Sequence, residues 1–179
     1  MVVLAASAAV ASVWAVSPDS AERAGAWAQA LFTSPEQDFS VAFPRSPSVD
    51  GRVPESDDAS GYRIFQARDD GGLFQVRVDQ YPRGIRVPMP DAYTYGLILR
   101  AYAVESSSRL VSTSPAQLGG HPALEGLFVG GAGARELRRV LMLGRRIYQV
   151  SYTRSDGGGD RETGTAFLES FKLVSPPAG

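Results

Sequence analysis

Short stretches in which apolar and polar residues alternate constrain this chain more than any other feature of its sequence. In residues 73–81, Phe74, Val76 and Val78 alternate with polar neighbours, and a glycine-containing turn joins this stretch to residues 62–68. A period of two places alternate side chains on one face of a strand, so the pattern predicts a half-buried β-hairpin.

The same alternation recurs along the chain, with two interruptions of helical character. Strands are expected at residues 39–43, 109–114, 122–129, 135–143 and 146–154. Residues 44–60 are rich in proline and acidic residues and are expected to form a surface loop. A helix is predicted after Asp91, with Tyr95 in its core face and Tyr93 on its surface, and a second helix near Asp160. This order predicts an α+β fold with a mainly antiparallel sheet of six to seven strands covered by helices.

Composition excludes several kinds of site. The 179 residues include 18 Lys+Arg and 19 Asp+Glu, a net charge of −1, which argues against a nucleic-acid-binding surface. The chain has no cysteine and a single histidine, His121, so disulfides, thiolate metal sites and paired-histidine zinc motifs are excluded. The glycine-rich loops have turn chemistry as a sufficient explanation, so no metal and no cofactor is expected.

The N-terminal segment has the character of a signal peptide. Residues 2–16 are uncharged, small and apolar, too short to cross a bilayer as a helix, and Val13-Trp14-Ala15 offers a cleavage site. We therefore expect residues 1–28 to be a signal peptide or tether and residues 37–174 to form one domain, followed by a tail at 175–179. The expected location is extracytoplasmic, periplasmic or secreted, with no stable transmembrane span after signal removal.

Several ordered segments resemble the PsbP-like fold of the extrinsic photosystem II proteins and of DcrB-type bacterial envelope proteins. They are Asp38-Phe39-Ser40-Val41-Ala42-Phe43-Pro44, Gly120-His121-Pro122-Ala123-Leu124-Glu125, Arg146-Ile147-Tyr148 and Phe167-Leu168-Glu169-Ser170-Phe171. The resemblance implies an α/β/α sandwich and, commonly, an exported protein that binds or assembles rather than catalyses. No catalytic motif is shared across that family, so the resemblance assigns no catalytic residue.

Strand register predicts an ion pair within the sheet. If a turn near Ala132 joins residues 123–129 to 135–141, Glu125 lies opposite Arg139 on an apolar face. Because an unpaired buried charge is costly, we expect a structural Glu125–Arg139 ion pair.

Register also predicts a pair of like charges at the end of the sheet. A two-residue turn at Gly144-Arg145 places Arg135 opposite Arg154, which is unfavourable unless solvent or an anion separates them. We take these two arginines, with Arg138 of the same basic segment, as the candidate binding residues. Glycine-rich loops and the start of the last helix are expected at the same end. Glu136, Asp156 and Asp160 are also nearby and can neutralise both arginines, so the alternative is a solvated surface without a ligand.

Three functions follow as hypotheses. The first is a non-enzymatic extracytoplasmic domain that binds an unknown protein or envelope component. The second is a small-ligand carrier with a pocket between the sheet and the helix at 91–105. The third is a hydrolase without a recognisable motif.

Overall fold

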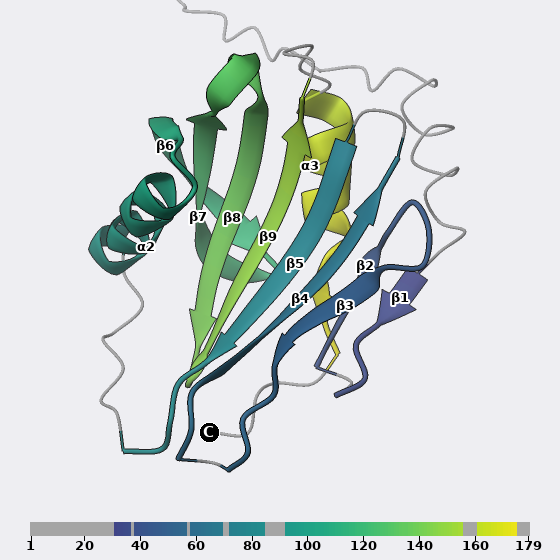
Figure 1. The fold of residues 1–179 in the computed structure, drawn as a ribbon, viewed down its shortest axis with the longest axis vertical. Coiled ribbons are helices and arrows are strands. Elements are labelled where there is room, and N and C mark those ends of the chain that lie inside the picture. Colours follow the sequence, from purple (N-terminus) through teal and green to yellow (C-terminus); the bar gives the residue numbers. More distant parts are fainter. Residues whose placement is uncertain are drawn as a thin grey trace, which may run out of the picture.

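The larger part of the chain is a seven-stranded antiparallel sheet, in the order β3-β4-β5-β9-β8-β7-β6 (Figure 1). The computed structural model describes residues 31–36, 38–56, 58–69, 72–84, 92–155 and 161–174. Within them, the strands of this sheet are β3 (Ser48–Arg52), β4 (Gly61–Arg68), β5 (Gly72–Gln80), β6 (Arg109–Leu118), β7 (His121–Val129), β8 (Arg135–Leu143) and β9 (Arg146–Arg154).

A second, three-stranded antiparallel sheet joins both ends of the described chain. Its order is β1-β2-β10, formed by β1 (Leu31–Thr33), β2 (Phe39–Ala42) and β10 (Lys172–Leu173). The α-helices of the described residues are α2 (Ala92–Glu105) and α3 (Arg161–Ser170), and a short 3₁₀ turn at Gly131–Gly133 joins β7 to β8. No helix in the described ranges is long and apolar enough to cross a membrane.

The large sheet has a core on each face. Helix α2 packs against β6, β7 and β8, whereas α3 packs against β8, β9 and β2. The core under α2 is centred on Leu99, Phe128 and Val140. The core under α3 and the small sheet is larger and rich in aromatic rings, including Phe74 and Phe167 in edge-to-face contact at 5.1 Å. Each face of the sheet therefore has a core, and β8 and β9 are buried on both faces.

The α+β class and the mainly antiparallel sheet are confirmed. Helix α2 also has the expected orientation, with Tyr95 buried and Tyr93 70% exposed. Tyr93 and Tyr95 differ in exposure because residues two apart do not share a helix face.

Two expectations about the N-terminal half are wrong. Residues 44–60 are not entirely loop, because β3 pairs with β4 along the edge of the large sheet. All five residues of β3 are exposed, so no apolar alternation marks this strand in the sequence. The folded region also begins before residue 37, since β1 pairs with β2. The expected signal segment at 1–28 and the tail at 175–179 lie outside the described residues.

Candidate binding site

Two arginines face each other at one end of the large sheet, on the side covered by α3. Arg135 of β8 is the register partner of Arg154 of β9, as the turn at Gly144-Arg145 predicts. Gly144 has φ +56°, a left-handed conformation that a glycine adopts without strain and that suits a tight hairpin. The Arg135 side chain is exposed and has no ion-pair or hydrogen-bond partner within the described part of the chain.

These arginines line a cavity of about 160 Å³. A third guanidinium enters it from Arg161, the first residue of α3. The only carboxylate side chain of the described residues that faces this cavity from the α3 side is that of Glu125, in β7. Glu136 also lines the cavity but pairs with Arg138 on the α2 side, so the described lining residues on the α3 side carry three cationic groups and one anionic group.

Strand register arranges the side chains that line the cavity in rows. Across β7, β8 and β9, the row next to the arginines consists of Leu127, Leu137 and Tyr152. The following row contains Glu125 and Arg139. The edge strand β6 supplies two exposed hydroxyl groups, those of Ser112 and Ser114. The cavity therefore changes from cationic to apolar to ion-paired along the strands.

Glu125 and Arg139 form the ion pair that the register predicts. Arg139 Nε donates a 2.9 Å hydrogen bond to Glu125 Oε2, and each side chain is 11% exposed. Arg139 also donates to the backbone oxygen of Gln117 at 3.2 Å. Arg161 approaches Glu125 Oε1 only to 3.7 Å, beyond hydrogen-bond distance, with its own side chain 75% exposed.

Arg161 is the cavity residue that sequence reasoning missed. It is 36 positions from Glu125 in sequence and no register argument connects a helix to a strand. The expected proximity of the last helix to this sheet end was the available signal. The glycine-rich loop at 156–160, expected at the same place, lies outside the described residues.

The assignment of Arg138 to this site is wrong. Its side chain is on the opposite face of the sheet, under α2, and is 2% exposed. Arg138 and Arg135 are three residues apart on one strand, and an odd separation places side chains on opposite faces. The guanidinium donates to Glu136 Oε1 at 2.6 Å and to Gln149 Oε1 at 2.9 Å, and lies 3.6 Å from the centre of the Tyr102 ring.

Arg138 belongs to a chain of polar groups that crosses the sheet beneath α2. Gln149 Nε2 donates to Asp79 Oδ2 at 2.9 Å, and Asp79 in turn pairs with Arg77 at 2.8 Å. At the other end, the Tyr102 hydroxyl donates to Glu136 Oε2 at 2.8 Å. Every buried side-chain nitrogen and oxygen of the described residues has a hydrogen-bond partner. The charges of this series of polar groups balance, and its contacts hold α2 against the sheet.

The pKa of Tyr102, the tyrosine at the end of this series of polar groups, is raised above its ordinary 10.0. Burial of the phenol is the largest cause. Glu136 raises this pKa further, and Arg138 opposes the rise.

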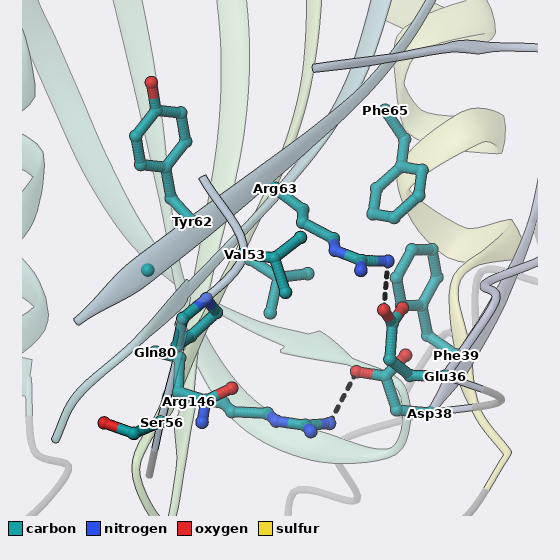
Figure 2. Close-up of a pocket in the computed structure, with 13 residues that line it drawn as sticks. Glu36, Asp38, Phe39, Val53, Ser56, Tyr62, Arg63, Phe65, Gln80 and Arg146 are labelled. Carbon is teal, nitrogen blue, oxygen red and sulfur yellow. Dashed lines mark hydrogen bonds and ion pairs between the residues drawn. The ribbon is translucent and has the colours of Figure 1, made fainter. Parts of the chain in front are cut away.

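A second cavity, of about 290 Å³, lies between the large sheet and the segment that joins β1 to β2 (Figure 2). Two ion pairs line it, Arg63 with Glu36 and Arg146 with Asp38, the latter at 2.8 Å. Asp38 Oδ2 also accepts the hydroxyl of Tyr148 at 3.2 Å. The charges in this cleft balance, and the pairs attach the small sheet to the large one.

A third cavity, of about 440 Å³, opens between α2 and the sheet edge. Tyr62, Tyr81 and Tyr102 line it, together with Arg77 and Glu105. This is the position at which a small-ligand pocket was expected from the sequence.

Among the residues that the structure describes, the remaining histidine and acidic side chains do not gather into a metal site. No group of three or more histidine and acidic side chains in the described ranges could hold a metal ion. His121, the single histidine, is exposed at the start of β7.

These features describe an antiparallel α+β domain with an arginine-lined cavity at one end of its large sheet. No family model matches the sequence, and no curated protein matches it. A crystal structure from Bacteroides thetaiotaomicron VPI-5482, determined at 1.50 Å resolution, is similar with a TM-score of 0.45 and 16% sequence identity. The similarity covers 83% of this chain and 50% of that one, so this chain spans about half the length of the Bacteroides structure.

Proposed function

We propose that this protein is a non-enzymatic binding domain that holds an anionic group of its ligand or partner in the arginine-lined cavity. The observation that carries the proposal is that Arg135, Arg154 and Arg161 line one cavity and that the exposed Arg135 side chain has no ion pair among the described residues. Like charges that face each other on neighbouring strands are unfavourable. An anion between the guanidinium groups is attracted by both, and an arginine fork matches the oxygens of a carboxylate or phosphate.

The size of the cavity sets what it can take. Pockets for whole drug-sized ligands have volumes of about 300–1,000 Å³. At about 160 Å³, this cavity suits a small anion or the charged end of a larger molecule.

We further propose an extracytoplasmic location and a PsbP-like α/β/α sandwich. The uncharged apolar segment at residues 2–16 supports the location, and the ordered segments that resemble the family support the fold. The placement of α2 and α3 on opposite faces of the sheet is compatible with such a sandwich. Intact-mass measurement of protein from its native host tests the location: loss of residues 1–15 is expected, and a mature protein that retains them would contradict it.

Titration of the folded protein with inorganic phosphate and with acetate, followed by amide NMR shifts, tests the binding function. We expect saturable shifts in β7, β8 and the start of α3 in the wild type. The variant Arg135→Glu/Arg154→Glu should lose them, because it reverses two of the three charges. The variant Arg45→Glu/Arg100→Glu makes the same change of charge at two exposed positions outside the cavity and should bind as the wild type does. Equal binding by both double variants would reject this site.

The cavity beside α2 favours a second candidate function, that of a small-ligand carrier. At about 440 Å³ it falls within the range of ligand pockets, and three tyrosines line it. The exposed residue Ala101 lies at this cavity, so Ala101→Trp should fill it without disturbing the core. Saturable binding of the apolar fluorophore N-phenylnaphthylamine to the wild type and not to Ala101→Trp would support the carrier function. Binding that Ala101→Trp leaves unchanged would reject this pocket.

A further inference from the structure

We propose that the anionic group is a carboxylate attached to an apolar body about as long as one aromatic ring, such as an aromatic or branched aliphatic monocarboxylate. This inference rests on the proposed function and names the chemistry of its ligand. It follows from the order of the side-chain rows that line the cavity.

The first row supplies the charge. Arg135 and Arg154 are direct cross-strand partners, so their Cβ atoms are about 5 Å apart, close enough for both guanidinium groups to reach one carboxylate. Each planar fork can donate two parallel hydrogen bonds to a carboxylate. The oxygens of the ligand therefore belong at this end of the cavity.

The second row is apolar and leads inward. Leu127, Leu137 and Tyr152 are one register step from the arginines, and Tyr152 and Leu137 are largely buried. Leu137 and Tyr152 already pack in the core under α3, whereas Leu127 is only partly buried and would stay uncovered beside a phosphate ion held by the arginines. A ring or branched chain attached to a carboxylate would cover it and remove apolar surface from water.

The third row limits the length of the ligand. Glu125 and Arg139 lie four residues from Val129 and Arg135, respectively, along β7 and β8, with the apolar row between them. A step of two residues along a strand is about 6.6 Å, so the apolar row has room for one ring before the ion pair begins. Glu125 Oε1, 3.7 Å from Arg161, retains lone pairs that could accept a hydrogen bond from a donor at the far end of such a ligand.

The charge of Glu125 does not oppose a carboxylate at the arginine row. Its Oε2 is committed to Arg139 at 2.9 Å, and Arg161 is also close. Among the described residues on this face, the charged side chains of the arginine row are all cationic, and Glu125 lies two rows away and is compensated.

The test compares benzoate, acetate and inorganic phosphate in amide NMR titrations of the whole folded chain. Benzoate is expected to bind at least about tenfold more tightly than acetate, because the ring buries additional apolar surface. Replacing the apolar floor by Leu127→Ser should bring the benzoate-to-acetate affinity ratio close to one. Because this ratio is measured within one variant, a modest loss of stability in that variant does not affect it.

A second variant avoids the core altogether. Ser112 is exposed on the edge strand and is the register partner of Leu127. Ser112→Glu should weaken benzoate binding more than Ser112→Gln does, because only the glutamate places a carboxylate beside the apolar row. Equal loss with both substitutions would overturn the assignment of the apolar row.

The outcomes distinguish a failure of this inference from a failure of the proposed binding function. If phosphate binds in a manner that requires Arg135 and benzoate binds no more tightly than acetate, the inference fails and the binding function stands. If none of the three anions shifts the amides around the cavity, both fail.

Discussion

Arg139 Nε donates a 2.9 Å hydrogen bond to Glu125 Oε2 across the neighbouring strands β8 and β7. Both side chains are only 11% exposed, and they lie on the face of the sheet that also carries the aromatic core under α3. In such surroundings each charge depends on the other, because neither is fully solvated.

Loss of one member of this pair should be severe. Glu125→Leu leaves the Arg139 guanidinium without its carboxylate, and removal of one partner of a buried pair typically costs about 3–5 kcal/mol of unfolding free energy. We expect a drop of this size in urea unfolding at pH 7. The double variant Glu125→Leu/Arg139→Leu should recover most of it, since no charge is then orphaned. An undiminished stability of Glu125→Leu would contradict a structural role for the pair.

Replacement of two helical glycines, Gly164 and Gly96, by alanine should have opposite effects on stability. A Cβ at Gly164 would lie 2.7 Å from Tyr152 Cδ1, and that ring packs 4.8 Å from Phe74 and cannot move freely. Overpacking costs about 1–3 kcal/mol, which should exceed the gain of about 1 kcal/mol in helix propensity. At Gly96 the nearest heavy atom is Arg100 Nη1 at 3.9 Å, so the propensity gain should dominate. Thermal melting should show a lower Tm for Gly164→Ala and a higher Tm for Gly96→Ala.

Arg138 and Arg135 lie on one strand and should differ in their importance for stability. Arg138→Met leaves the buried carboxylate of Glu136 without its 2.6 Å ion pair, and should cost about 3–5 kcal/mol. Arg135→Met changes an exposed side chain and should alter stability by no more than about 0.5 kcal/mol. Denaturant unfolding of the two variants measures both values, and similar losses would contradict the assignment of the two side chains to opposite faces.

Alkaline pH should destabilise the protein through Tyr102. Burial raises the pKa of this phenol above 10.0, so above pH 10 the unfolded chain releases the proton while the folded chain retains it. The unfolded state then binds fewer protons, and stability falls as pH rises through the raised pKa.

The matched variant for this prediction is Tyr102→Phe. At pH 7 it should lose about 1.5–3 kcal/mol, because the hydroxyl bonds the charged Glu136. Between pH 9 and 11, however, its Tm should fall less steeply than that of the wild type. Some slope should remain, since burial also raises the pKa of Tyr148. Identical slopes would contradict the role of Tyr102.

Hairpin register made part of the candidate site predictable from the sequence. The turn at Gly144-Arg145 fixes Arg135 opposite Arg154, and the turn near Ala132 fixes Glu125 opposite Arg139. Strand alternation also contained the information that Arg138 is on the other face, because it is an odd number of residues from Arg135. Arg161 could not be placed in this way, since its approach to Glu125 depends on how α3 docks on the sheet.

The sequence by itself determined the α+β class and the local pairings β4-β5, β7-β8 and β8-β9, because alternation and short turns act between neighbours in the chain. Only the tertiary structure decided the pairing of β5 with β9, the exposed edge strand β3, and the contact of Arg146 with Asp38, 108 positions away. Those contacts depend on which apolar faces pack together once the chain is compact. Arg161, the third arginine of the cavity, depends on such packing, whereas Arg135, Arg154 and Glu125 follow from local strand register.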